Sequence, residues 1–96
     1  MRPDRLLERW RQQVPRDGAA LEDMLAVIRY LGMEVEHRRS GHLAVSHPSL
    51  IGSAVFPQGV VTVNAHAFGR QGCVHPSALR DLVKAAKIIE DAGQNE

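Results

Sequence analysis

The residue of this sequence best placed to do chemistry is His42, which follows two arginines and a tight turn. Arg38 and Arg39 precede it, Ser40-Gly41 is a turn signal, and His42 then opens a strand. Alternation along that strand points His42 to the open face of a sheet or to its rim. An exposed imidazole can transfer protons near neutral pH while guanidinium groups hold a phosphate. The pattern indicates proton transfer at a phosphate, but a surface histidine beside a basic turn, without function, has the same pattern.

The other histidines and the single cysteine are not spaced for metal binding or nucleophilic catalysis. The sequence has five histidines, but no Cys-x-x-Cys, His-x-His or His-Glu-x-x-His spacing. His42 and His47 are an odd number of residues apart, so one continuous strand would point them to opposite faces. Cys73 lies near His75 in a glycine-rich loop, with no nucleophile elbow or phosphate-binding loop in the chain. We therefore predict no metal site and an unreactive thiol.

Length, cysteine content and charge bound the class of protein. The 96 residues make one small domain, residues 1–96, which is too short for a Rossmann or TIM-barrel enzyme. A single cysteine forms no intramolecular disulfide, and neither a signal peptide nor a membrane-spanning run is evident, so we expect a cytoplasmic protein. The net charge of +1 is low for a nucleic-acid binder. Lys and Arg gather around the turn before His42 and in the last helix, which gives weak support to an anionic partner.

Two helices are predicted in the first third of the chain. Residues 4–14 carry an apolar stripe, with Asp4 as the N-cap and Trp10 as the anchor that docks the helix on the core. A second apolar stripe follows, with Asp17 as its cap and Gly32 at the position of a left-handed C-terminal glycine.

The pattern then changes to the period of β-strands. Residues 33–38 alternate between apolar and charged residues, which predicts a half-buried strand. Residues 42–46 form a second strand that His47-Pro48-Ser49 ends, and the two strands are close enough in the sequence to form a hairpin.

The segment from residue 50 to residue 74 is open to two interpretations. Val60–Val63 is strongly β-forming, and Ser53–Phe56 is a further candidate strand separated from it by the turn residues Pro57-Gln58-Gly59. Either one strand follows a long loop or a further hairpin forms, and we favour the hairpin. We predict that residues 65–74 form a loop.

The last helix completes the fold. It begins at Pro76, carries an apolar face and ends at Gly93. The predicted class is α+β: a two-layer sandwich in which an antiparallel sheet of three or four strands packs on helices, with residues 4–14 as an extra N-terminal helix.

The order of motifs resembles the HicA-type toxins of bacterial type II toxin–antitoxin pairs. The resemblance rests on R-R-S-G-H-L-A-V-S-H-P, then V-T-V-N-A-H, then the helix A-L-R-D-L-V-K-A-A-K-I-I. It implies a fold like that of double-stranded-RNA-binding domains, α-β-β-β-α, over residues 19–92. It also implies an endoribonuclease that cleaves mRNA without a metal or cofactor, and a HicB-like antitoxin that covers its site.

The resemblance also assigns roles to residues of this chain. His42 matches the catalytic histidine, and His47-Pro48 and His66 match the other landmarks. The residues expected to bind RNA are Arg38, Arg39, Ser40, Gly41, Lys84 and Lys87. His66 is expected to be an auxiliary group. RNA carries its own nucleophile, the 2′-hydroxyl, so one histidine that moves protons suffices in this reading.

A second reading is a non-catalytic module of the same fold that binds RNA or protein, of phage or mobile-element origin. The low net charge and the small number of aromatic residues favour it, because RNA-binding sheets stack bases on exposed aromatic side chains. The histidine in its basic context favours the toxin.

Overall fold

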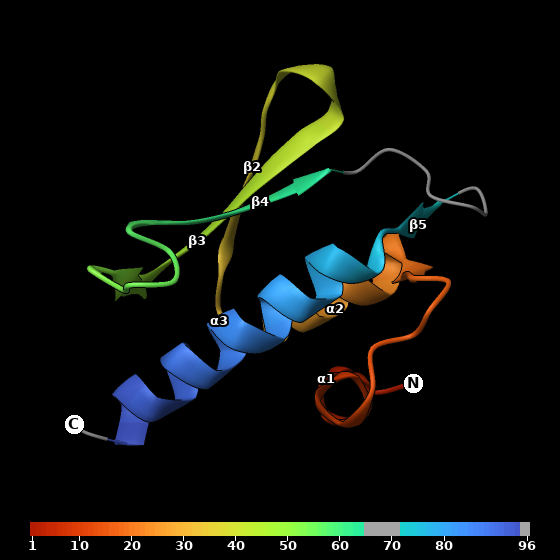
Figure 1. Ribbon diagram of the computed structural model, residues 1–96, viewed down its shortest axis with the longest axis horizontal. Coiled ribbons are helices and arrows are strands. Elements are labelled where there is room, and N and C mark those ends of the chain that lie inside the picture. Colours follow the sequence, from red (N-terminus) through yellow and green to blue (C-terminus); the bar gives the residue numbers. More distant parts are fainter. Residues whose placement is uncertain (65–71, 95–96) are drawn as a thin grey trace.

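The central part of the chain has the predicted order of helix, three strands and helix. A computed structural model describes residues 1–64 and 72–94, apart from the side chains of Ser40 and Gln94. The elements of this order are α2 (Leu21–Tyr30), β2 (Glu34–His37), β3 (His42–Ile51), β4 (Gln58–Asn64) and α3 (Pro76–Gln94) (Figure 1). The three strands form one antiparallel sheet in the order β2-β3-β4. The α+β class is therefore confirmed, with three strands in the main sheet.

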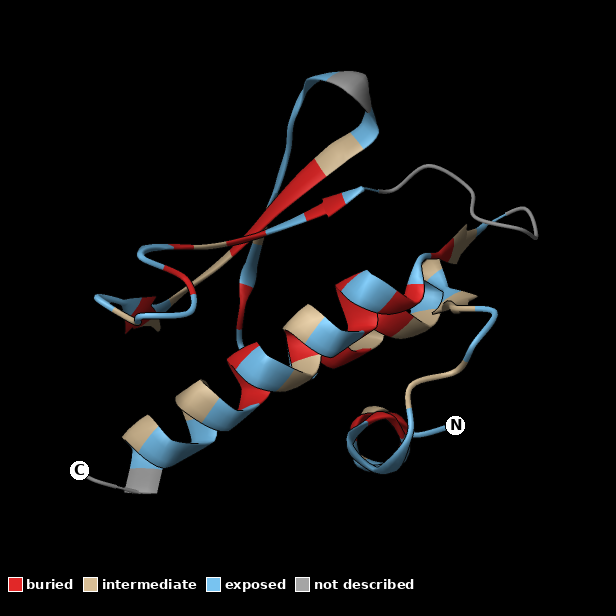
Figure 2. Cartoon of the chain, in the orientation of Figure 1, coloured by how far each residue is buried: buried red, intermediate tan, exposed pale blue. Residues whose placement is uncertain are grey.

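The core lies between this sheet and the helices. Leu43 pairs with Val63 and Val45 with Val61, and all four side chains are buried on the same face of the sheet. Helix α3 packs on β3 and β4, and α2 contributes to the same core. Figure 2 shows buried residues on the sides of α3 and the strands that face each other. Each fully buried aliphatic side chain contributes about 1.5–3 kcal/mol of hydrophobic stabilisation. The other face of the sheet, turned away from the helices, is called the open face below.

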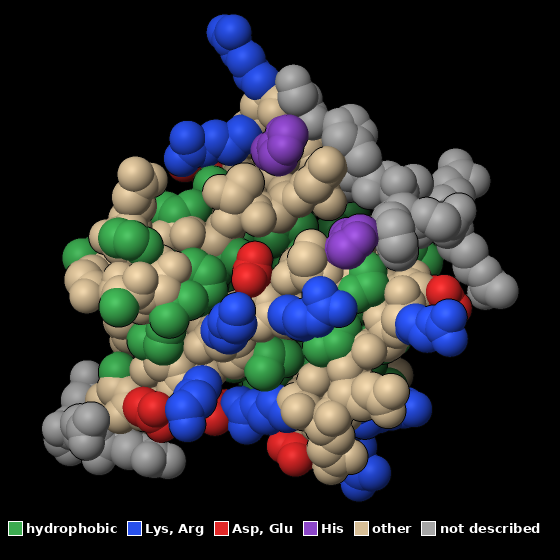
Figure 3. Space-filling model, viewed as in Figure 1, with side chains coloured by type: hydrophobic (Ala, Val, Ile, Leu, Met, Phe, Trp, Pro, Cys, Tyr) green, Lys and Arg blue, Asp and Glu red, His purple; other side chains and the backbone are tan. Residues whose placement is uncertain are grey.

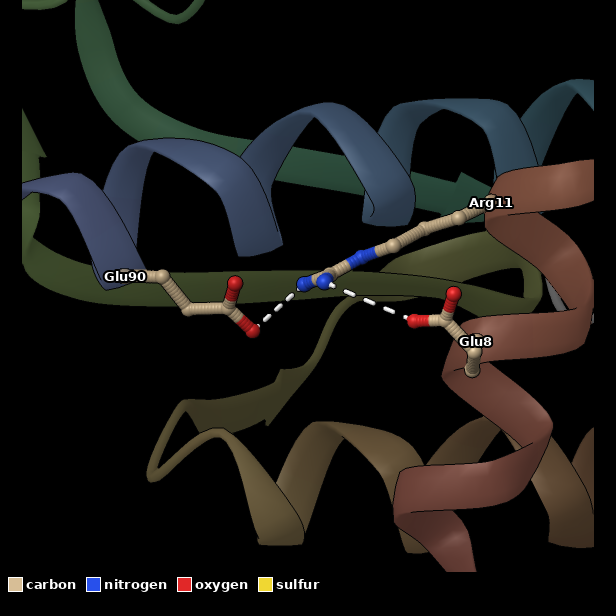
Figure 4. A network of polar contacts seen from close by, with 3 residues as sticks. All are labelled: Glu8, Arg11 and Glu90. Atoms are coloured by element: carbon tan, nitrogen blue, oxygen red, sulfur yellow. Dashed lines mark hydrogen bonds and ion pairs between the residues drawn. The ribbon is translucent and has the colours of Figure 1, made fainter.

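The N-terminal helix α1 (Pro3–Gln12) packs on α2 and α3 on the side away from the sheet (Figure 1). Trp10 is 4% exposed, which confirms its prediction as the docking anchor. Arg11 forms ion pairs with Glu90 of α3 and, at 3.9 Å, with Glu8 of its own helix (Figure 4). Trp10 therefore anchors α1 in the core, and a polar contact joins α1 to α3.

The ends of α1 differ from the prediction. The helix begins at Pro3, and Asp4 lies in its first turn, where it forms an ion pair with Arg2 at 3.3 Å instead of capping the helix. The helix ends at Gln12 rather than at Val14, because the backbone of Gln13 is already extended. An acidic residue in the first turn is also favoured by the helix dipole, so its presence does not identify the cap.

A second, two-stranded sheet was not predicted. It pairs β1 (Ala19–Ala20) with β5 (Cys73–Val74) in antiparallel register. β5 lies in the segment 65–74 that we predicted to be loop, and β1 lies where the cap at Asp17 predicted the first turn of the second helix. The same pairing explains why Asp17 does not cap α2. The N-cap residue is Ala20, and the N–H of Leu21 donates to the carbonyl of Gly72 at 2.7 Å. A backbone acceptor distant in the sequence thus replaces the side-chain cap.

The C-terminal end of α2 is formed as predicted. Gly32 has a φ of 73°, its N–H donates to Arg29 O at 3.0 Å, and the N–H of Met33 donates to Ile28 O at 3.1 Å. These two bonds make a Schellman motif, and the buried Met33 and Ile28 supply its apolar contact. The motif turns the chain from α2 into β2.

Strand β3 is longer than predicted, because His47-Pro48-Ser49 does not end it. Pro48 has no N–H for the ladder, and the register with β4 shifts between Ser46 and Ile51, but the chain stays extended. Within this irregular segment, the N–H of Ser49 donates to Nδ1 of His47 at 3.0 Å. This local hydrogen bond lies at Pro48, where the regular pairing of the strand is interrupted.

The additional hairpin predicted from Ser53–Phe56 is wrong. Ser53 Oγ accepts hydrogen bonds from the N–H groups of Val55 and Phe56 at 3.1 and 3.3 Å, which folds this segment into a turn. The segment is the loop between β3 and β4, so the hairpin partner of β4 is β3 itself.

Helix α3 begins at Pro76, as predicted, but continues through Gly93 to Gln94. The N–H of Ser77 donates to Nδ1 of His75 at 3.0 Å and so caps the first turn. Gly93 has no left-handed backbone, so it does not terminate the helix. Neither α3 nor any other helix of the described residues is long and apolar enough to cross a membrane.

Candidate functional site

The turn between β2 and β3 positions His42. Residues 39–41 form one turn of 3-10 helix, and Gly41 has a φ of 73°, a conformation that a side chain disfavours. The N–H of Arg38 donates to His42 O at 2.8 Å and closes the turn. His42 is therefore the first residue of β3, as predicted.

The register of the sheet places the His42 side chain on the open face. His42 pairs with Asn64, whereas Leu43, the next residue of the strand, points into the core. The imidazole is partly exposed, and its Nδ1 lies 3.4 Å from the carbonyl oxygen of Arg39. A neutral imidazole with its proton on Nδ1 can make this contact, and Nε2 is then the basic nitrogen.

His42 and the two arginines before it share one hollow on the open face. This hairpin hollow has a volume of about 500 Å³ and is lined by Arg38, Arg39, His42, Ala44, Gln58, Val60 and Thr62. Figure 3 shows Lys and Arg side chains and a histidine at the top of the view, over the turn between β2 and β3. Two guanidinium groups, an imidazole, an amide and a hydroxyl are the groups that bind and protonate a phosphodiester. The hollow therefore has the chemistry of a phosphate site.

Carboxylates also lie on the open face. Glu34 pairs with Ser46 and Glu36 with Ala44, so both acidic residues of β2 share the face of His42. Glu36 lies 3.7 Å from Arg38, and both side chains are largely exposed. No aromatic residue lies on this face among the described residues. The face is mixed in charge and offers no stacking platform in that part of the chain.

The other residues predicted to bind RNA lie elsewhere or only partly within the described chain. Lys84 and Lys87 of α3 line a different hollow of about 440 Å³, which they share with Arg11 of α1. The structure does not bring them to the hairpin hollow. Ser40 lies in the turn, with its backbone alone described, and His66 lies outside the described residues.

The remaining described histidines have local roles. Nδ1 of His47 and Nδ1 of His75 each accept the backbone N–H two residues later, so both nitrogens are unprotonated in this geometry. His37 ends β2 opposite Leu43 and is exposed, although the predicted alternation places it on the apolar side of the strand with Met33 and Val35. Within the described part of the chain, no three His, Cys, Asp or Glu side chains lie close enough together to hold a metal ion.

Two polar residues that line the hairpin hollow were missed in the sequence. Thr62 is exposed between the buried Val61 and Val63, and Gln58 begins the same strand. The alternation of β4 was a usable signal, because it places Thr62 on the face opposite to the valines. What the pattern lacked was the register that brings β4 beside His42.

No known protein family, curated protein or solved structure matches this chain.

Proposed function

We propose that this chain is the toxin of a type II toxin–antitoxin pair, a metal-independent endoribonuclease that cleaves mRNA with His42 as its catalytic histidine. One observation carries the enzymatic part of the proposal: His42, Arg38 and Arg39 line the same hollow. The HicA-like order of motifs along the chain supports the biological role.

The chemistry requires few protein groups. The 2′-oxygen of the RNA attacks the adjacent phosphorus, its proton passes to Nε2 of His42, and the bond from phosphorus to the 5′-oxygen breaks. The departing 5′-oxygen takes a proton from His42 or from water. Arg38 and Arg39 stabilise the charge that develops on the phosphorane oxygens. The products are a 2′,3′-cyclic phosphate and a 5′-hydroxyl.

The proposed protein partner is a HicB-like antitoxin that covers the hairpin hollow. The hollow is lined by the exposed Arg38 and Arg39 of the turn, so a protein surface that contacts these residues can cover it. Charge complementarity requires acidic residues on the partner opposite Arg38 and Arg39.

A non-catalytic module of the same fold is the second candidate function. Glu34 and Glu36 on the open face favour this reading, because carboxylates repel RNA and suit a protein partner. Such a module would bind through the same face without cleaving RNA.

The test compares RNA cleavage by the purified chain and by His42→Ala. Loss of general acid–base catalysis lowers the cleavage rate by about 10²–10⁴-fold. His37→Ala is the matched control, because His37 is an exposed histidine on the other side of the same turn and points to the other face of the sheet. We expect His37→Ala to cleave at the rate of the natural chain, with and without a chelator.

Product analysis makes the test specific. A 2′-deoxynucleotide at the cleavage site blocks cleavage if the 2′-hydroxyl is the nucleophile. Cleavage that persists in His42→Ala would remove His42 from the mechanism. A natural chain that binds a partner protein but cuts no RNA would favour the non-catalytic module.

A further inference from the structure

The two outer edges of the main sheet differ in charge. β2 has four residues, three of which are Glu34, Glu36 and His37, and Arg38 follows. β4 has seven residues and none of them is charged. Short length and charged side chains protect a strand edge from pairing with another chain. β2 has both protections and β4 has neither.

The middle of β4 is positioned to pair with a further strand. In an antiparallel ladder, alternate residues direct their N–H and C=O groups to the neighbouring strand and the residues between direct theirs outward. Among residues 1–64 and 72–94, β3 is the only strand that pairs with β4. We call Val60–Val63 the neutral edge.

We propose that the neutral edge is a homodimer interface, in which β4 of two copies pair antiparallel about a two-fold axis at Val61. This register is self-complementary. Val61 meets its own copy, and Val60 of each copy meets Thr62 of the other, so residues of the open face pair with residues of the open face. Valine and threonine are also favourable cross-strand neighbours.

The absence of charge on the neutral edge favours a second copy over a charged partner strand as the occupant. A charged partner strand gains no complementarity from an edge that has no charged residue. Two copies of this chain, each with a net charge of +1, repel each other only weakly. The corresponding self-pairing of β2 would bring Glu34 and Glu36 against the same residues of the other copy, so it is disfavoured.

The dimer would join two three-stranded sheets into one with a continuous open face. Val60 and Thr62 also line the hairpin hollow, so the two hollows would lie on the same face on either side of the axis. This arrangement goes beyond the proposed ribonuclease activity and does not depend on it.

The test measures the oligomeric state of the purified chain by sedimentation, without RNA, from micromolar to millimolar concentration. We expect a concentration-dependent dimer. Thr62→Lys places ammonium groups of the two copies close together and raises the dissociation constant by about tenfold or more. Thr62 is exposed, so the variant keeps its core. Glu36→Gln is the control, because it makes the same change in charge on the other edge, and we expect it to leave the dissociation constant within about twofold.

Hydrogen exchange of the natural chain gives a second measurement that needs no variant. We expect alternate amides of the neutral edge to gain protection at high concentration, while amides of β2 show no change. A chain that stays monomeric to millimolar concentration would overturn the proposal. A dimer that Thr62→Lys leaves intact, or one that protects β2 instead of β4, would overturn it as well. None of these measurements depends on RNA cleavage. The dimer proposal and the ribonuclease proposal can therefore be contradicted independently of each other.

Discussion

Two regions of the molecule carry several basic residues, and they differ in what surrounds those residues. In the hairpin hollow, Arg38 and Arg39 lie beside the imidazole of His42 on the open face. Between α1 and α3, Lys84 and Lys87 line a hollow with Arg11, but Glu90 and Asp91 line it too. Figure 3 shows the same contrast, since blue and red side chains are mixed in the lower half of the view.

The number of cations alone therefore does not identify an anion-binding site. Between α1 and α3, Arg11 forms ion pairs with the carboxylates of Glu8 and Glu90 (Figure 4), so its positive charge is balanced within the protein. Beside the hairpin hollow, the ion pair of Arg38 with Glu36 is exposed and 3.7 Å long, which makes it weak. A phosphate can displace such a pair. This difference supports the proposal that the hairpin hollow binds a ligand, whereas the charges of the α1–α3 region contribute to stability.

The largest expected effect is a loss of stability when Trp10, which docks α1 on the core, is replaced. Trp10→Ala removes a side chain that is 4% exposed in the contact of α1 with the core. We expect the free energy of unfolding to fall by about 3–5 kcal/mol in urea denaturation. Tyr30→Ala, at an aromatic residue that is 55% exposed, is the control and should cost less than about 0.5 kcal/mol. Equal losses in the two variants would mean that α1 is not docked by Trp10.

The next effect concerns the arginines of the hairpin hollow. Replacing Arg38 and Arg39 together by alanine removes the groups that we propose to stabilise the phosphorane, and we expect the RNA cleavage rate to fall by about a hundredfold. Both side chains are exposed, so the melting temperature should not change. The control replaces Lys84 and Lys87 together by alanine, which removes the same charge from the other region. We expect cleavage within about twofold of the natural rate for this control. A larger loss from the lysine pair than from the arginine pair would reverse the assignment.

The sequence predicts elements where a periodic pattern is long enough to detect. The apolar stripes of α1 and α2 were found this way, and the motif at Gly32 and the start of α3 at Pro76 were found from single residues that favour helix ends. The pairing of β1 with β5 was not, because strands of two residues have no detectable period and their partners lie far apart in the chain. Local chemistry misled the prediction at Ser53, where a β-forming segment folds into a turn around one hydroxyl group.

The same limit applies to the candidate site. Residues next to His42 in the sequence, Arg38 and Arg39, were predicted and do line its hollow. Lys84 and Lys87 were grouped with them by charge and lie in another region. Thr62 was missed because its place beside His42 depends on the register of β3 with β4. Residues that are close in the sequence can be predicted to share a site from the local pattern. Residues on neighbouring strands can be predicted to share a site only when the register of the sheet is known.

The smallest effect tests whether the polar contact between α1 and α3 matters beside Trp10. Arg11 is 31% exposed and Glu90 is 43% exposed, so water screens their attraction. A double-mutant cycle with Arg11→Met and Glu90→Gln keeps the aliphatic part of Arg11 in place and isolates the ion pair. We expect a coupling energy of about 0.5 kcal/mol that decreases as salt is added. A coupling above about 2 kcal/mol that persists in molar salt would contradict this expectation, because only a desolvated pair behaves in that way. The ion pair between α1 and α3 would then make a substantial contribution to the docking of α1, in addition to that of Trp10.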